Sequence, residues 1–373
     1  MVKYNVFFEP VLEFNKRMSG FENYISFSEV LADWKKDSTI EELSALLNEY
    51  DICIFRVDTY SLATSLVFEN IELLNKLFKL AEISEVYIHN PPKKFLNSLK
   101  QQIAQEQLFI SNKSFEKISE QEIIQVKIDL NARIIGQDKA KKSILRKLVA
   151  QLVRPGCKPL VLMFYGDPGI GKTETAKQLS ATLFQNEEII REQMSMVGGE
   201  SSVKYFKSTT HSEDSFSKTL LNRASNVILL DEFALAPSFF HTTFFQMFDE
   251  GIYEDQNYRV DLRNSIIICT SNYKSRSELQ NNIDDALLSR FDGFIKFSPL
   301  SFKEKKNILE LVYNQITSPS NMMSNYTNHL NEMEILTEVT SKLESLRNVR
   351  EIRKYVEDII ADKLLEFIIN SGE

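Results

Sequence analysis

The segment Gly166-Asp167-Pro168-Gly169-Ile170-Gly171-Lys172-Thr173 has the residue types and the spacing of a phosphate-binding loop. It follows an apolar run at 160–165 and precedes a helix-like stretch at 173–183, which is the position that such a loop requires. The glycines let backbone N–H groups close around phosphate oxygens, and the start of a helix adds positive potential. Lys172 would neutralise the outer phosphates, and the Thr173 hydroxyl would bind Mg²⁺. An ordinary glycine-rich turn between a strand and a helix is the alternative.

Two carboxylates, Asp231 and Glu232, directly follow a second apolar run at 227–230. Ligands of open α/β sheets bind at the carboxyl ends of the strands, so both acids are expected at such an edge. There Asp231 would hold Mg²⁺, directly or through water, and Glu232 would polarise the water that attacks the γ-phosphate. Two acids in a solvated loop are the alternative, which the phosphate-loop pattern disfavours.

Two more polar residues lie beside apolar runs. Asn272 comes after the run 266–269 and offers a neutral amide that can orient the attacking water or contact the γ-phosphate, although it can also cap a helix or a turn. Arg290 precedes a weaker run at 294–297 and is either part of the site or a partner in a surface salt bridge.

The elements that must position these residues follow from the hydrophobic pattern. From residue 131 onward, short continuous apolar runs alternate with helix-like stretches, which is typical of parallel strands covered on both faces. Beyond residue 299 the strand pattern ends, and apolar residues recur every three or four positions over 302–316, 332–346 and 349–369. We therefore expect a small helical domain after the sheet.

The first third of the chain has its own pattern. Strands are predicted at 4–8, 51–57 and 85–89, and helices at 69–81 and 93–107. A polar segment follows at 111–122, and the predicted domains are 1–122, 123–298 and 299–373. The first of these has no phosphate loop, and its many aromatic residues form either a core or a partner-binding surface.

The composition fits a folded chain and disfavours two classes of partner. Of the 373 residues, 43% are hydrophobic and 26% charged, and the net charge of −8 makes nucleic acid an unlikely partner. Cys53, Cys157 and Cys269 lie too far apart for a zinc site, so we expect free thiols in a reducing compartment. No basic leader and no apolar run of membrane-spanning length is present, and we predict a cytoplasmic protein without a membrane partner.

These motifs resemble those of the AAA+ ATPases, and within them the C-terminal ATPase module of the Clp-type unfoldases and disaggregases. Ile134-Ile135-Gly136-Gln137-Asp138 is similar to the box that flanks the adenine, and 227–233 to the Walker B segment. Asp249-Glu250-Gly251 and 260–264 resemble the hairpin before sensor 1, and Thr270-Ser271-Asn272 resembles sensor 1 itself. The similarity covers about 240 residues, from 131 to 373.

The resemblance implies further roles. Arg290 occupies the arginine-finger position, so it would reach the nucleotide of a neighbouring subunit in a ring or another homo-oligomer. Arg350, in a segment similar to sensor 2, would contact the nucleotide of its own chain, although a solvated basic helix face is the alternative. The predicted catalytic residues are Glu232, Asn272, Arg290 and Arg350, and the predicted metal ligands are Thr173 and Asp231. The predicted nucleotide-binding residues are Ile134, Ile135, Asp167, Pro168, Gly169, Ile170, Gly171, Lys172, Thr173, Glu174, Asp231 and Arg350.

The sequence also departs from the family pattern. Where Clp-type unfoldases carry a Gly-aromatic-Val-Gly pore loop, this chain has residues 201–208, in which Tyr205 and Phe206 either grip a polypeptide or pack in the core. No loop of the kind that docks a partner peptidase is found, and the sequence ends where members usually continue into terminal strands.

The resemblance implies an α/β fold of the AAA+ P-loop type, with a parallel sheet flanked by helices, a C-terminal small helical domain and a separate small α/β N-terminal domain. It implies ATP and Mg²⁺ as cofactors and an oligomeric ATPase that remodels or unfolds a protein partner. The alternative is an ATP-dependent assembly switch or scaffold that regulates an effector without threading a polypeptide.

Overall fold

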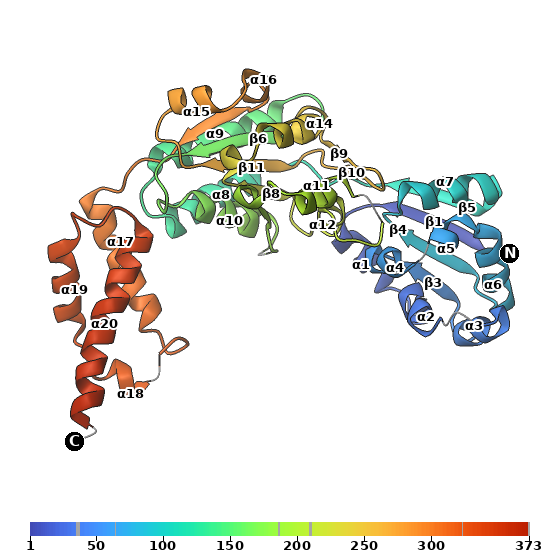
Figure 1. Cartoon of the computed structure of the whole chain (residues 1–373), viewed down its shortest axis with the longest axis horizontal. Coiled ribbons are helices and arrows are strands. Elements are labelled where there is room, and N and C mark those ends of the chain that lie inside the picture. The colour runs from blue at the N-terminus through green and yellow to red at the C-terminus, as the bar shows by residue number, and fades with distance from the viewer. Residues whose placement is uncertain (35–37, 64, 186, 209–210, 323, 372–373) are drawn as a thin grey trace.

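The computed structural model places three bodies in a row, with the N-terminal body and the C-terminal helices at opposite ends of a central sheet (Figure 1). It describes the chain except for residues 35–37, 64, 186, 209–210, 323 and 372–373. The fold class predicted from the sequence, parallel sheets flanked by helices with a helical C-terminal part, is confirmed. No helix in the described part of the chain is long and apolar enough to cross a bilayer.

The N-terminal body contains a parallel five-stranded sheet in the order β2-β3-β4-β1-β5. Its strands are β1 (Lys3–Phe8), β2 (Tyr24–Ser26), β3 (Ile52–Phe55), β4 (Glu85–His89) and β5 (Leu108–Asn112). Helix α1 (Val11–Met18) packs on one face through Phe14 and Met18. The other face is covered by α2 (Phe27–Asp33), α3 (Ile40–Leu47), α4 (Val57–Leu62), α5 (Ser65–Glu69), α6 (Ile71–Leu80) and α7 (Lys93–Gln102).

Two strands of this sheet, β2 and β5, were not predicted from the hydrophobic pattern of the sequence. β2 has three residues, and β5 is half-buried, so neither gives a continuous apolar run. The helix predicted to reach residue 107 ends at Gln102, because the chain turns through a short 3₁₀ segment (Gln105–Gln107) into β5.

The central sheet is also parallel, in the order β12-β6-β11-β8-β7. Its strands are β6 (Leu160–Tyr165), β7 (Ile190–Gln193), β8 (Val227–Asp231), β11 (Ile266–Ser271) and β12 (Gly293–Lys296). Pairing of Leu230 with Cys269 sets Asp231 beside Thr270, and Gln193 of β7 lies opposite Asp231. All five carboxyl ends therefore meet at one edge, where the phosphate-binding loop, Asp231, Glu232 and Asn272 lie.

The helices of the central body cover both faces of its sheet. They are α8 (Glu120–Arg133), α9 (Asp138–Val153), α10 (Lys172–Leu183), α11 (Glu200–Lys207), α12 (Phe216–Leu221), α13 (Ser238–His241), α14 (Phe245–Glu250), α15 (Arg276–Asn282) and α16 (Asp285–Leu288). An antiparallel hairpin, β9 (Ile252–Glu254) and β10 (Arg259–Asp261), projects toward the N-terminal body (Figure 1).

The C-terminal body consists of helices α17 (Phe302–Ile316), α18 (Ser324–Thr327), α19 (Glu332–Lys342) and α20 (Val349–Ser371). Apolar residues of α17, α19 and α20 share one core with one face of the central sheet. The predicted division at 122/123 falls in the first turn of α8 and that at 298/299 in the connection before α17. The three-domain division remains our proposal.

Polar contacts join the N-terminal body to the hairpin. The Lys93 backbone N–H donates to the Asn257 carbonyl oxygen at 2.8 Å, and Lys93 Nζ lies 3.0 Å from Glu254 Oε1. Nearby, Asn264 Nδ2 donates to the Phe115 carbonyl oxygen at 2.8 Å. Interfaces between domains of one chain are commonly of this polar kind.

Candidate nucleotide-binding site

The glycine-rich loop connects β6 to α10 and requires glycine at defined positions. Gly166 has φ +140°, and a Cβ there would collide with the carbonyl oxygen of Phe297. Gly169 has φ +69° and lies against the Asn348 side chain, while Gly171, with φ +104°, is the N-cap of α10. Residues with a side chain rarely adopt these backbone conformations, so the glycines permit a tight loop at the start of a helix. This is the geometry that binds phosphate groups.

Lys172 points back into this loop. Its Nζ donates to the carbonyl oxygens of Gly166 and Asp167 at 2.6 and 2.7 Å, and to Asn272 Oδ1 at 3.1 Å. The residue is 6% exposed, and burial lowers the pKa of its amine to about 8, against the opposing effect of Asp231 and Asp167. A polyanion bound here would stabilise the charged ammonium form.

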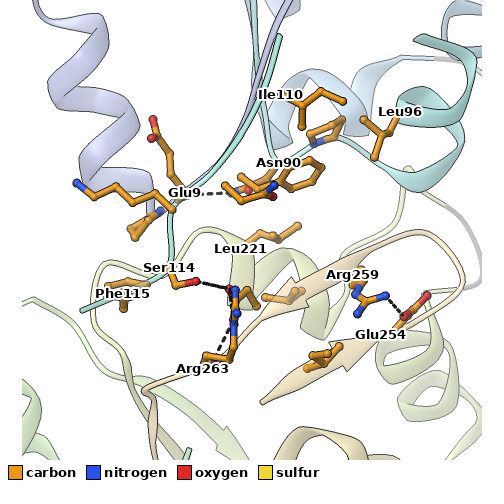
Figure 2. A pocket seen from close by; sticks show the side chains of 18 of the residues that line it. Glu9, Asn90, Leu96, Ile110, Ser114, Phe115, Leu221, Glu254, Arg259 and Arg263 are labelled. Atoms are coloured by element: carbon orange, nitrogen blue, oxygen red, sulfur yellow. Dashed lines mark hydrogen bonds and ion pairs between the residues drawn. The ribbon is translucent and has the colours of Figure 1, made fainter. Parts of the chain in front are cut away.

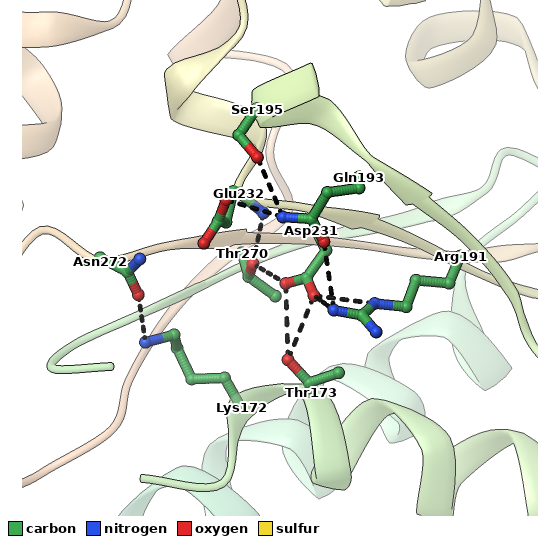
Figure 3. Close-up of polar contacts among 9 residues, drawn as sticks. All are labelled: Lys172, Thr173, Arg191, Gln193, Ser195, Asp231, Glu232, Thr270 and Asn272. Carbon is green, nitrogen blue, oxygen red and sulfur yellow. Dashed lines mark hydrogen bonds and ion pairs between the residues drawn. The ribbon is translucent and has the colours of Figure 1, made fainter. Parts of the chain in front are cut away.

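Asp231 is the centre of the polar cluster in Figure 3. The Thr173 hydroxyl lies 3.4 and 3.5 Å from its two carboxylate oxygens, and the Thr270 hydroxyl donates to Oδ1 at 2.5 Å. Arg191 donates to Oδ2 from Nε at 2.9 Å and from its terminal nitrogen at 2.5 Å. These bonds hold the carboxylate in one orientation, facing the start of α10.

Arg191 was not predicted from the sequence. It lies on β7, whose residues are half-buried or exposed and so give no apolar run. The signal that could have revealed it is topological, because an α/β chain needs a strand between α10 and α11.

Glu232 follows Asp231 in a left-handed backbone conformation with φ +55°. Such a conformation is uncommon for a residue with a side chain and occurs preferentially at functional sites. The Glu232 backbone N–H donates to the Thr270 hydroxyl at 2.8 Å, and Gln193 Nε2 donates to the Glu232 carboxylate at 2.7 Å. Glu232 is thereby aimed into the same space as Lys172 (Figure 3).

Asn272 accepts the hydrogen bond from Lys172 and does not cap the next helix, because Ser275 is the N-cap of α15. The C-terminal body reaches the loop through its last helix, since the Val349 N–H donates to the Gly169 carbonyl oxygen at 3.0 Å. Arg350, one residue later, is exposed and lies within electrostatic range of Lys172, whose pKa it lowers.

A cavity of about 910 Å³ unites these parts. Most predicted residues line it: Ile134, Ile135, Pro168, Gly169, Ile170, Gly171, Lys172, Thr173, Glu174, Asp231, Glu232, Asn272 and Arg350. The structure adds Arg191, Gln193, Thr270, Gln315 and Arg353 to its wall. Asp167 does not line it, and its carboxylate lies 3.4 Å from Lys274 Nζ.

Arg290 also lies away from this cavity. Its Nε donates to Asp249 at 2.8 Å, its terminal nitrogen donates to the Ala286 carbonyl oxygen at 2.5 Å, and its guanidinium lies 3.9 Å from the centre of the Phe245 ring. The structure therefore does not bring Arg290 to the nucleotide site of its own chain. Its expected action on a neighbouring subunit remains a prediction.

The donor atoms of Thr173 and Asp231 fit Mg²⁺. Both are oxygens, which this ion prefers, and they face each other across 3.4 to 3.5 Å. No group of three or more His, Cys, Asp or Glu that could hold a metal occurs among the described residues. Mg²⁺ at this site would therefore complete its shell with water and phosphate oxygens, as is usual for this ion.

Comparison with known proteins agrees with this geometry. The AAA domain family (Cdc48 subfamily) matches residues 158–331. The chaperone protein ClpB of Aquifex aeolicus is 28% identical over 302 residues, which cover 68% of this chain and 29% of the relative. The ATP-binding subunit ClpL of the ATP-dependent Clp protease from Staphylococcus aureus (strain bovine RF122 / ET3-1) is 29% identical over 267 residues. These residues cover 65% of this chain and 38% of ClpL. The chain thus spans about a third of the length of these relatives.

A solved structure of Hsp104 with ATPγS and FITC casein, in its closed state, has a similar fold. Its TM-score is 0.55 at 18% identity, and the match covers 90% of this chain and 66% of that one. The fold and the site define a nucleotide-binding P-loop module. Within that class, residues 158–331 match the AAA domain family, and the chain is similar to the AAA+ ATPase modules of Clp-type proteins.

Proposed function

We propose that the chain hydrolyses ATP with Mg²⁺ at the carboxyl edge of its central sheet. The observation that carries this proposal is the convergence of Lys172, Thr173, Asp231 and Glu232 on one cavity. Lys172 and the loop N–H groups would bind the phosphates, and Thr173 and Asp231 would hold the metal, which would neutralise charge developing on the phosphates. Glu232 would accept a proton from the attacking water, and Asn272 and Arg350 would orient the γ-phosphate.

Replacing Glu232 with Gln tests this proposal. The variant keeps the shape of the side chain but lacks the base, so ATP still binds while turnover falls by about 10²- to 10⁴-fold. Phosphate release and ATP binding are measured on the same preparation. Glu200→Gln, at a carboxylate 89% exposed in its side chain, is the matched control with unchanged turnover. Normal turnover by Glu232→Gln would show that another group is the base.

We propose further that the protein works as a homo-oligomer and remodels a protein partner in the cytoplasm. Support for oligomeric action comes from Arg290, which lies outside its own nucleotide cavity. Support for a protein client comes from two similar proteins, the chaperone protein ClpB and the Hsp104 whose structure contains casein. The free thiols of Cys53 and Cys269, both buried, support a reducing compartment.

One observation favours the alternative, an assembly switch that threads nothing. The segment 201–208 forms most of α11, in which Phe206 is 2% exposed and the Tyr205 hydroxyl donates to Glu192 at 2.6 Å. Both aromatic side chains are therefore packed, not presented to a polypeptide.

An unfolded reporter protein separates the two functions. A remodelling machine reactivates or unfolds the reporter with ATP and does neither when Glu232 is replaced by Gln. A switch leaves the reporter unchanged, but its sedimentation profile depends on ATP. If the protein hydrolyses ATP but neither acts on the reporter nor changes its assembly with ATP, both functions are contradicted.

A further inference from the structure

The N-terminal sheet has a topological switch point between β1 and β4. Helix α1 leaves β1 toward one face, where Phe14 packs on Phe7 and Tyr87. Helix α7 leaves β4 toward the opposite face, where Phe95 packs in the larger core. Because the chain diverges after these neighbouring strands, a crevice opens at their carboxyl ends. Open parallel sheets bind their ligands in such crevices.

A cavity of about 640 Å³ lies at this crevice (Figure 2). Glu9, Asn90 and Ile110, from the ends of β1, β4 and β5, lie on one side of it. Arg259 and Arg263, from the β9–β10 hairpin and the residues after it, lie on the other side. Ligand pockets commonly have this volume and form between domains.

Cationic side chains outnumber carboxylates two to one in the wall, although the whole chain is acidic. The cations are Lys93, Lys100, Lys113, Arg223, Arg259 and Arg263, and the carboxylates are Glu9, Glu254 and Asp261. Two wall residues are paired from outside the wall: Arg17 donates to both carboxylate oxygens of Glu9 at 3.0 and 3.1 Å, and Lys113 Nζ donates to the Glu13 carboxylate at 2.6 Å. Five cations then remain against two carboxylates. The cavity therefore has a local excess of positive charge.

Arg223 is the most deeply buried of these cations, at 7% exposure. Among the described residues, its hydrogen-bond acceptors are neutral: the carbonyl oxygens of Leu220 at 2.7 Å and Asp261 at 2.6 Å, and the Asn226 amide oxygen at 3.1 Å. Burial lowers the pKa of its guanidinium to about 10, partly offset by the Asp261 carboxylate. A buried charge without a bonded counter-charge is costly, and an anion in the cavity would compensate it.

Two further features suit an anion. Lys100 is exposed on α7 and has no ion pair with any residue that the structure describes. Helices α1 and α7 begin after Pro10 and Pro92, which both line or adjoin the cavity, and neither first turn is capped by a side chain. The Lys93 N–H at the start of α7 already donates to the Asn257 carbonyl oxygen at 2.8 Å, and the remaining N–H groups of the two first turns add to the positive potential of the side chains.

We propose that this cavity binds a small phosphate-bearing molecule, which bridges the N-terminal body and the β9–β10 hairpin. The site is separate from the P-loop and lies at the edge of the other sheet. The β10 strand leads within a few residues into β11, which carries Thr270 near its end and is followed directly by Asn272. Ligand at the cavity thus contacts the segment that continues into the nucleotide site.

Calorimetry on the full chain with Lys172→Ala tests the proposal, because that change removes phosphate binding at the P-loop. The probes are AMP, inorganic pyrophosphate and inorganic phosphate. We expect saturable heat from AMP or pyrophosphate, with a dissociation constant of about 1 mM or below. Binding of AMP alone indicates a nucleotide, and binding of pyrophosphate with equal or greater affinity indicates a free polyphosphate.

Variants on both sides of the cavity locate the site. In the same background, Lys100→Glu and Arg259→Gln each weaken binding by about tenfold, because each removes a charge-assisted contact. Lys94→Glu is the matched control on α7, exposed and outside the cavity wall, and changes affinity less than about twofold. Absence of heat from all three probes, or unchanged affinity in either cavity variant, would overturn the proposal.

Discussion

The molecule has two parallel sheets with a cavity at the carboxyl edge of each, and the two cavities differ in how they are built. At the central sheet, glycines, a lysine and two acids come from adjacent positions in short motifs. At the N-terminal sheet, the cations come from several elements that lie far apart in the chain, including a hairpin of the other body. The comparison teaches that strand order can create a binding crevice without leaving a sequence motif.

The cavities also differ in completeness. The N-terminal cavity has both walls within one chain (Figure 2). The nucleotide cavity lacks Arg290, which the family resemblance places at a neighbour's nucleotide. Changes at Arg290 should therefore affect only the nucleotide cavity, and only in an oligomer.

Arg290→Ala is expected to have the largest effect. An arginine finger contributes about 10³- to 10⁵-fold to turnover, so the uniform variant should be nearly inactive. Mixing it with Lys172→Ala subunits should restore part of the turnover, because an intact loop then meets an intact Arg290. AMP binding to the N-terminal cavity should not change.

Asp249→Asn is the matched control for this prediction. It breaks the 2.8 Å ion pair of Arg290 but keeps the guanidinium. If Arg290 is only structural, Asp249→Asn and Arg290→Ala should impair turnover alike, and mixing should restore nothing at any ratio. That outcome would remove the contrast between a shared and a self-contained cavity.

The pH dependence of ATP binding gives a smaller effect. In the free protein Lys172 has a pKa of about 8, lowered by burial, so its ammonium group loses its proton as the pH rises through that value. The phosphates bind the charged form, and affinity should therefore fall by up to about tenfold per pH unit above pH 8. Calorimetry between about pH 7 and about pH 9.5 measures this fall. Constant affinity across the range would contradict this prediction, because it would show that the Lys172 amine does not lose a phosphate-binding proton near pH 8.

The smallest predicted effect concerns α11, which contacts both β7 of the central sheet and the β9–β10 hairpin. Tyr205 bonds to Glu192 on β7, and the next residue, Phe206, accepts a hydrogen bond from Tyr253 of the hairpin at 2.5 Å. Tyr205→Phe leaves the half-buried Glu192 carboxylate without this donor and should lower the free energy of unfolding by about 1 kcal/mol. Thermal unfolding measures this loss, with Lys204→Ala on the same helix as the control. A large loss of turnover without destabilisation would instead assign Tyr205 a functional role.

The sequence predicted the central sheet well because three of its five strands, β6, β8 and β11, are buried on both faces and therefore read as apolar runs. The fourth, β12, is partly exposed and gives the weaker run. β7 was missed, and Arg191 with it, because Ile190–Gln193 contains neither a continuous apolar run nor an alternation of apolar and polar residues. The residues of the phosphate-binding loop, 166–173, were predicted because one short segment determines both their backbone conformation and their chemistry.

The remaining features depend on tertiary structure. The hydrogen bond from Val349 to Gly169, and the carboxylate partners of Arg191 and Gln193, join residues far apart in the chain. The N-terminal cavity depends on how two bodies meet, which no periodicity encodes. Similarly, the packing of Phe206 follows from the aromatic side chains around it, including Phe216 and Phe244.

The most direct test of the central claim is calorimetric titration of the full chain with Mg²⁺ and ATP. We predict saturable binding at the P-loop that is lost in Lys172→Ala, where any remaining heat belongs to the N-terminal cavity. This binding is retained in Lys177→Ala, a change at an exposed lysine of the same helix outside the cavity wall. No heat from the unaltered chain, or equal heat from Lys172→Ala, would contradict the central claim.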